Sequence, residues 1–157
     1  MLPKNILCFS SVPWDFKMRR PQQLLIRFAE QANVYFFEEP VFDAQNDCFI
    51  TFSTRSETLW KVVPHVLPNL SREQISTCME QLLDDFFKKA NLDNWTFWYY
   101  TKNAFSFSKK YKPKLTIYDS IAGYDEGHSS DWDEIFTAIH SKIKSQLSSV
   151  NIIDLCN

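Results

Sequence analysis

The chain has 157 residues, and 45% of them are hydrophobic, which is enough to build the core of one domain. Its 17 basic and 19 acidic residues nearly balance, which argues against a general nucleic-acid-binding protein, because such proteins usually carry a marked basic excess. The two glycines, Gly123 and Gly127, are too few for a phosphate-binding loop of the G-x-G-x-x-G or Walker type.

The cysteines and histidines are too dispersed to predict a metal site or a redox motif. None of the four cysteines forms a C-x-x-C pair, and the three histidines lie far apart in the sequence. No stretch approaches the ~20 apolar residues of a membrane-spanning helix, and the first apolar run is too short for a secretory signal. We therefore expect a cytoplasmic protein with reduced cysteines, no transmembrane segment, no nucleic-acid partner, and neither a metal nor another cofactor.

The first forty residues predict a β-α-β unit. Residues 4–10 form a short apolar run that ends in serines, as a buried strand does, and residues 34–40 form a second run that stops at Pro40. Between them, Pro21 suits the first turn of a helix, where its missing N–H costs nothing, and the following apolar residues recur at helical spacing. A helix between two buried strands is typical of a parallel α/β unit.

The next segment predicts a hairpin followed by a helix. Apolar and polar residues alternate over residues 48–53, and residues 58–63 follow after a polar break, which favours a β-hairpin. Ser71 with Gln74 three residues later matches a capping box, which predicts the start of an amphipathic helix that runs to about residue 89.

The last third of the chain continues the alternation of strands and helices. Strands are expected at residues 95–101, 114–120 and 150–155, and helices at residues 103–111 and 131–146. Together the elements predict an α/β fold, a doubly wound and mostly parallel Rossmann-like sheet with a β-hairpin insertion, in one domain of residues 1–157. The strands that start near Ile6, Val34, Thr96 and Leu115 should then be adjacent and parallel, with helices on both faces.

The loop before the first helix carries an unusual set of charges. Ligands of doubly wound sheets bind at the carboxyl ends of the strands, and Arg19 and Arg20 lie at such an end, beside a helix N-terminus that favours anions. Arginine has forked donors that suit phosphate or carboxylate, so one interpretation is an anion or sugar-phosphate site. The other is structural, with the arginines paired to Asp15, Glu38 or Glu39. We predict an ion pair of Arg19 or Arg20 with Glu38 or Glu39.

Two further features leave alternatives open. Trp14 is either a platform on which a sugar stacks or a lid on the core. Residues 119–134 are rich in acids and contain no Lys or Arg, but they do not match a D-x-[DN]-x-[DN]-G calcium loop. The predicted start of a helix explains about half of these acids, so we expect no metal there.

Five stretches of the chain, in this order, carry a recognisable pattern: WDFKMRRPQQLL, YFFEEPVFD, KVVPHVLPNLS, FWYYTKNAFSFS and LTIYDS. They resemble stretches of bacterial GT-B-type glycosyltransferases that act on nucleotide-sugar donors. Members of that family carry a tryptophan and an R-P-Q stretch after the first strand, then F-F-E-E-P, valine-proline-histidine, W-Y-Y-T and Y-D stretches. Order and spacing match over residues 5–120. Residues 121–157 diverge, beginning with Ile121, Ala122 and Gly123 where the family usually has another acidic pair.

The resemblance implies the Rossmann-like N-terminal half of such an enzyme, which usually receives the acceptor. The candidate cleft residues that it implies are Trp14, Arg20, Glu39, His65, Tyr100 and Asp119. Within this set, Asp119 or His65 would be the base that takes a proton from the acceptor hydroxyl, and Arg20 would contact an anion.

The complete enzyme would bind a nucleotide-sugar and a carbohydrate acceptor, and a second domain or a partner chain would supply the donor contacts. Because these residues cannot build a second Rossmann-like domain, we expect a glycosyltransferase homologue that is inactive alone. The alternative is a non-catalytic protein-interaction module that retains the fold. A small nucleotide-binding protein is disfavoured, because no glycine precedes Gly123.

Overall fold

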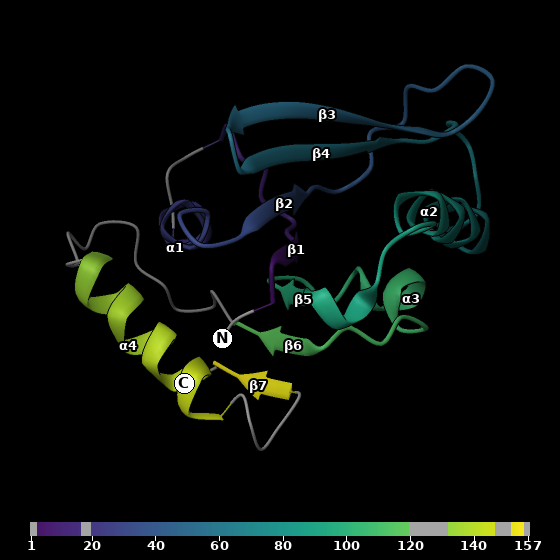
Figure 1. Ribbon diagram of the computed structural model, residues 1–157. Coiled ribbons are helices and arrows are strands. Elements are labelled where there is room, and N and C mark those ends of the chain that lie inside the picture. Colours follow the sequence, from purple (N-terminus) through teal and green to yellow (C-terminus); the bar gives the residue numbers. More distant parts are fainter. Residues whose placement is uncertain (1–2, 17–19, 120–131, 147–151, 156–157) are drawn as a thin grey trace.

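One sheet of seven strands organises the computed structural model, which describes residues 3–16, 20–119, 132–146 and 152–155 (Figure 1). The strand order is β3 (Phe49–Ser56), β4 (Leu59–His65), β2 (Asn33–Phe37), β1 (Asn5–Phe9), β5 (Trp95–Tyr99), β6 (Leu115–Tyr118) and β7 (Ile152–Asp154). Neighbouring strands are parallel throughout this sheet except for β3 and β4, which are antiparallel.

The four central strands confirm the predicted core of the sheet. β2, β1, β5 and β6 are adjacent and parallel, with Ile6 opposite both Val34 and Thr96, and Thr96 opposite Leu115. The chain leaves β1 toward β2 on one side and later enters β5 on the other side, so the sheet is doubly wound about β1.

Helices cover both faces of the sheet, as predicted. α1 (Arg20–Phe28) and α4 (Trp132–Gln146) lie on one face, and α2 (Arg72–Phe86) and α3 (Phe105–Ser108) lie on the other (Figure 1). A 3-10 turn, η1 (Leu92–Asn94), leads into β5. Within the described ranges, no helix is long and apolar enough to cross a membrane.

α4 lies on the face of the sheet opposite to the one expected for a helix between β6 and β7. The step from β1 to β2 and the step from β6 to β7 run in opposite directions across the sheet, yet α1 and α4 lie on the same face. The crossover through α4 therefore has the opposite hand to the crossover through α1. The crossovers through α2 and α3 have the same hand as the one through α1. Because about 98% of such crossovers are right-handed, the β6-α4-β7 unit is the exception in this sheet.

Burial on both faces explains why the central strands are continuous apolar runs. In β1, Ile6 and Cys8 point toward α1, whereas Leu7 and Phe9 point toward α2, and all four are at most 2% exposed. A strand that is enclosed on both faces has no solvent side on which polar residues would alternate.

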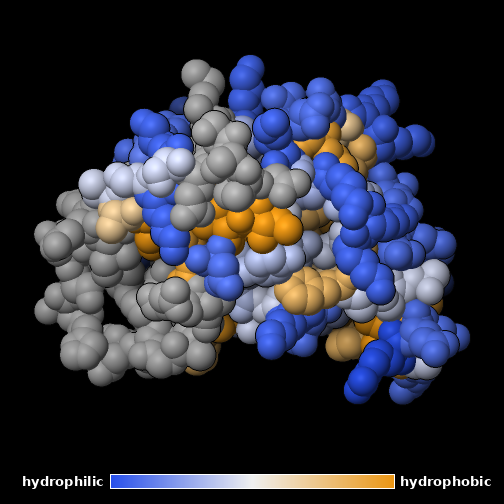
Figure 2. Space-filling model, turned by 90° about the horizontal axis from the view of Figure 1, so that it is seen from below, coloured by the Kyte–Doolittle hydropathy of each residue, from blue (hydrophilic) through white to orange (hydrophobic). Residues whose placement is uncertain are grey.

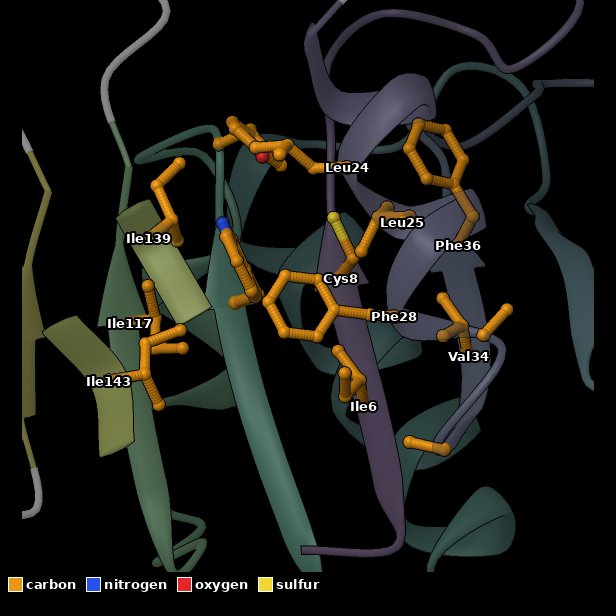
Figure 3. Close-up of a cluster of buried hydrophobic side chains, with 14 of the residues drawn as sticks. Ile6, Cys8, Leu24, Leu25, Phe28, Val34, Phe36, Ile117, Ile139 and Ile143 are labelled. Carbon is orange, nitrogen blue, oxygen red and sulfur yellow. The ribbon is translucent and has the colours of Figure 1, made fainter. Parts of the chain in front are cut away.

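The core between the sheet and the α1 and α4 layer is largely aliphatic. Figure 3 shows the ring of Phe28 of α1 between Cys8 and Ile6 of β1, while Ile139 and Ile143 of α4 lie over Ile117 of β6. This packing holds both helices against the strands whose ends form the candidate site.

The two edges of the sheet are built differently. At one edge, β3 and β4 form the predicted hairpin, but β4 also pairs in parallel with β2, so the hairpin extends the main sheet instead of forming a separate insertion. At the other edge, β7 has three residues, and Ile152 is 55% exposed. Figure 2 views the molecule from this side and shows an area of apolar surface near its middle, with polar surface beside it.

A capping box decides where α2 begins. Ser71 Oγ accepts a hydrogen bond from the N–H of Gln74 at 3.2 Å, and the N–H of Ser71 donates to Gln74 Oε1 at 2.8 Å, which confirms the capping box of α2. α3 is shorter than predicted. It begins only at Phe105, and its N-cap residue Ala104 makes no side-chain hydrogen bond. In the turn before it, the N–H of Asn103 donates to Thr101 Oγ1 at 3.2 Å.

Candidate functional site

A row of polar side chains lies at the carboxyl edge of the sheet, on the α1 and α4 face. Five neighbouring strands contribute one residue each. In the order of β4, β2, β1, β5 and β6, these residues are His65, Glu38, Ser10, Tyr100 and Asp119, and we call them the polar row. The row spans β1, where the strand order reverses, and doubly wound sheets bind their ligands at this position.

Strand alternation places these residues on one face. The backbone N–H groups of Ser10, Glu38, Tyr100 and Asp119 continue the ladder one residue beyond their strands and donate to neighbouring carbonyls at 2.9–3.1 Å. Each therefore shares a face with the residue two positions earlier, which packs in the core under α1 and α4. All four residues are buried, with exposed fractions of 9% or less.

Glu38 and Ser10 shape the loop between β1 and α1. Glu38 Oε2 accepts a hydrogen bond from the N–H of Trp14 at 2.8 Å, and Ser10 Oγ accepts one from the N–H of Val12 at 3.1 Å. Burial raises the pKa of Glu38 above its ordinary value, because the carboxylate loses hydration, and the bond from Trp14 offsets part of this shift. Gln22 Nε2 donates to the carbonyl of Trp14 at 3.2 Å, so the loop is held from both sides.

Trp14 covers the core on this face. Its ring meets the ring of Phe36 edge-on, with centroids 5.1 Å apart and planes at 72°, and its side chain is partly buried. This contact supports the interpretation of Trp14 as a lid on the core. The residue Arg19 and the side chain of Arg20 lie outside the described part of the chain, so their ion pair with Glu38 or Glu39 stays a prediction.

The hairpin supplies cations to the same loop. Asp15 Oδ2 accepts hydrogen bonds from Arg55 Nη2 at 2.8 Å and from Lys61 Nζ at 2.9 Å. These bonds, above all the one from Lys61, hold the pKa of Asp15 below its ordinary value. Both cations lie 40 or more residues away in sequence, so no local pattern indicates them as partners.

Glu39 lies on the opposite side of the chain from the polar row. It is exposed, and its Oε1 accepts a hydrogen bond from Asn103 Nδ2 at 2.9 Å. It borders a groove of about 730 Å³ against α2 and α3, which Arg72 and Lys102 also line. Successive side chains of an extended segment point to opposite faces, so of the two adjacent glutamates it is Glu38 that belongs to the row.

His65 is held at the end of β4 by three neighbours. Its Nδ1 lies 2.7 Å from Asp43 Oδ1, and its Nε2 lies 2.9 Å from Thr51 Oγ1. The ring of Phe49 stacks on the imidazole, with centroids 4.5 Å apart and planes at 8°. Asp43 and Thr51 were not predicted, because they lie 22 and 14 residues from His65. Thr51 meets His65 through the hairpin, and Asp43 meets it through the segment that precedes β3.

His65 and Asp119, the two candidate bases, stand at opposite ends of the polar row. They are separated by four strand spacings, which at ~4.8 Å each amount to roughly 19 Å. They cannot both act on one hydroxyl group. The side chain of His65 is 16% exposed, whereas Asp119 is 3% exposed, so His65 is the more accessible of the two.

Tyr100 and Asp119 form the end of the row on β5 and β6. Tyr100 stacks on Trp98, with centroids 6.0 Å apart and planes at 25°. Burial, together with the charge of Asp119, raises the pKa of Cys8 well above its ordinary value. Cys8 therefore stays a protonated thiol beneath the row, where it packs as a small apolar side chain.

The structure shows no metal-binding cluster in the part of the chain that it describes, meaning a group of three or more His, Cys, Asp or Glu residues. Most of the acidic segment considered above, residues 120–131, lies outside that part. The candidate site therefore consists of the polar row and the loop that Glu38 holds.

Comparison with protein-family models and with curated proteins finds no match. Among solved structures, the chain is similar to a trehalose-6-phosphate synthase from E. coli bound with UDP-2-fluoro glucose, with a TM-score of 0.52 and 9% sequence identity. The match covers 95% of this chain and 39% of that enzyme. A second similar structure is the α,α-trehalose 6-phosphate synthase from Burkholderia multivorans, with a TM-score of 0.48, 9% identity, and 92% and 38% of the two chains covered.

These similarities concern the fold. The E. coli enzyme is a GT-B glycosyltransferase, so the predicted relation to the GT-B fold is confirmed, as is the doubly wound α/β architecture. At 9% identity, the substrates of the neighbours are not transferred to this chain. The chain spans 39% of the length of the E. coli enzyme.

Proposed function

We propose that this chain is the acceptor-side half of a GT-B glycosyltransferase, and that the polar row is the wall of its acceptor cleft. The observation that carries the proposal is the row itself: five adjacent strands of a GT-B-like sheet each end in a polar residue on the same face. On the sequence resemblance, we also propose a bacterial origin, a cytoplasmic location, and a nucleotide-sugar as the donor.

In this proposal, His65 is the base that takes the proton from the acceptor hydroxyl. If Nδ1 carries its proton toward Asp43, then Nε2 presents a lone pair, and the hydroxyl of Thr51 at 2.9 Å occupies the place that a substrate hydroxyl would take. Asp119 is too deeply buried for this role without movement of the residues around it. It would instead orient groups at the far end of the row.

If the proposal is correct, the chain is inactive in the absence of a donor-binding domain. In a two-domain transferase, the leaving diphosphate is stabilised by donors from the other domain, and each such donor typically contributes ~2.7–4 kcal/mol to the transition state. The helix N-terminus of α1, with Arg20, would hold an anion with a millimolar constant at best, which corresponds to about 4 kcal/mol. The remaining donors would come from protein beyond these 157 residues or from another chain.

Calorimetric titration of the 157-residue chain with UDP- and GDP-sugars, together with a turnover assay, tests the proposal. We expect no micromolar binding and no turnover by the chain alone. We also expect turnover to appear when a donor-binding domain is supplied, and His65→Gln to reduce it by at least 100-fold. Micromolar binding or clear turnover by the chain alone would contradict the proposal.

The second candidate function is a non-catalytic interaction module, and exposed apolar residues favour it. Val41 and Phe49 are 42% and 46% exposed and lie beside His65 at the same edge of the sheet, and Phe42, which follows Val41 in the chain, is 51% exposed. Exposed apolar groups that gather near a candidate site are typical of protein contact surfaces.

Sedimentation velocity distinguishes the two functions. A module that associates through this surface should form dimers whose fraction rises with concentration, and Phe49→Ser should abolish them. The glycosyltransferase half should remain monomeric in the absence of its donor domain, and Phe49→Ser should leave its sedimentation unchanged.

A further inference from the structure

Two cysteines face each other across the space between β3 and α2. The rings of Phe52 in β3 and Phe86 in α2 stack with centroids 6.0 Å apart, which aligns the two elements at that level. Cys48 lies four residues before Phe52, about 13 Å away along an extended chain, and Cys78 lies eight residues before Phe86, about 12 Å away along a helix. Because β3 and α2 both start at the carboxyl edge, the two displacements run in the same direction and bring the cysteines level.

The surroundings of the two thiols agree with this placement of Cys48 opposite Cys78. Cys48 and Cys78 are both partly buried and pack against the same core cluster, under α2 and α3. Burial raises the pKa of Cys78, and the neighbouring Cys48 thiol adds to this shift, so the two groups interact in the reduced state. By contrast, Cys8 lies in the other core cluster and is fully buried.

We propose that Cys48 and Cys78 are a reversible redox pair that forms a disulfide between the start of β3 and α2. The oxidant is a low-molecular-weight disulfide such as oxidised glutathione. One thiolate attacks it and releases one reduced glutathione, and the second thiolate then displaces the other. In sum, two protein S–H bonds and the S–S bond of oxidised glutathione break, and one protein S–S bond and two glutathione S–H bonds form. Two electrons pass to glutathione, and the two protons are taken up by the glutathione thiolates that leave.

The disulfide would tether the segment that leads from Glu38 to β3. That segment carries Asp43, the partner of His65, and ends at Cys48, so the link would fix it to α2 in the oxidised protein. It would also close a loop between cysteines 30 positions apart. A loop of this length should raise the melting temperature by about 5–10 °C.

The test uses the 157-residue chain with Cys156→Ser, so that Cys8 is the remaining cysteine beside the pair. After incubation with oxidised glutathione, we expect the intact mass to fall by about 2 Da, the mass of the two hydrogen atoms lost. A peptide map without reductant should join the peptides of Cys48 and Cys78. Dithiothreitol should restore the mass and reverse the rise in melting temperature.

Matched variants make the result specific. Cys48→Ser and Cys78→Ser should each prevent the loss of mass, whereas Cys8→Ala should leave it unchanged. The proposal is overturned if the mass does not fall, if stable glutathione adducts accumulate on both cysteines, or if the disulfide forms only between two chains.

Discussion

The two faces of the sheet reach the carboxyl edge in different ways. On the α2 and α3 face, aromatic rings continue to the edge, where Phe9 stacks on Tyr99 at 5.0 Å and meets Phe107 at 6.1 Å. The hydroxyl of Tyr99 is satisfied inside this layer by Ser108 Oγ at 2.7 Å. On the α1 and α4 face, the same strands end in the buried polar side chains of the polar row.

This difference indicates that the α2 and α3 face mainly stabilises the fold, whereas the α1 and α4 face carries the candidate site. Aromatic rings that are closed off from water stabilise the fold, because they bury large apolar areas in preferred geometries. Buried polar side chains cost desolvation, and natural proteins accept that cost chiefly where a site needs them. The comparison therefore predicts large effects on stability from the α2 and α3 face, and smaller, pH-dependent effects from the polar row and its loop.

The largest effect is expected for Phe97→Ala. Phe97 is 1% exposed and meets the rings of Phe9, Phe87 and Tyr111, so its loss leaves a cavity in the aromatic layer. Urea denaturation should show a decrease of about 3–5 kcal/mol in the free energy of unfolding. Phe42→Ala, at a residue that is 51% exposed, is the control and should stay within about 0.5 kcal/mol. A decrease below about 1 kcal/mol for Phe97→Ala would contradict the role given to this face.

The next effect concerns Tyr99 in alkaline solution. Burial raises the pKa of Tyr99 from its ordinary value of 10.0 to about 12. The unfolded chain therefore releases this proton first, and the free energy of unfolding should fall as pH rises from 10 toward 12, by up to about 2 kcal/mol. The phenylalanine of the Tyr99→Phe variant cannot titrate, so the excess in the free energy of unfolding of the wild type over the variant should shrink over this pH range. A difference that is constant with pH would show that Tyr99 ionises as easily in the folded protein as in the unfolded chain.

A smaller effect is expected for Glu38→Gln in the polar row. The folded protein binds the proton of Glu38 more tightly than the unfolded chain does, because its pKa is raised above 4.5. Wild type should therefore lose stability as pH rises above 4.5, whereas the variant keeps a neutral acceptor for the N–H of Trp14. In thermal unfolding the variant should be the more stable protein at pH 7, and near pH 4 the two proteins should coincide. A less stable variant at pH 7 would mean that the charge itself holds the loop.

The smallest effect is expected for Asp15→Asn. Asp15 binds Arg55 and Lys61 at the surface, and 54% of its side chain is exposed. Exposed pairs of this kind contribute about 0.2–1 kcal/mol, and salt screens them. Because the pKa of Asp15 is lowered, this contribution should be present above pH 3.8 and disappear as pH falls below it. An effect that is unchanged in 1 M NaCl would exclude an electrostatic origin.

Patterns within short segments were sufficient to predict the elements. The runs that contain Ile6, Val34, Thr96 and Leu115 are strands, and their adjacency follows from the alternation of strands with helices. The start of α2 was predicted to the residue, because a capping box depends on positions only three residues apart. The end of α2 and the length of α3 were predicted less well, since they depend on contacts beyond the helix.

The candidate site was predicted only in part. His65, Tyr100 and Asp119 lie in the polar row, but Glu38 and Ser10 were not proposed for it. Alternation shows that adjacent glutamates point to opposite faces. Which face carries the row depends on where α1 packs, and that is decided by the tertiary structure.

The sequence by itself determined the class of fold, because hydrophobic periodicity is a property of consecutive residues. Only the tertiary structure decided that Asp15 meets Arg55 and Lys61, and that His65 lies between Asp43 and Thr51. Such neighbours follow from the order and register of strands that are far apart in the chain. The packing of the whole core sets that order and register, and no single segment encodes them.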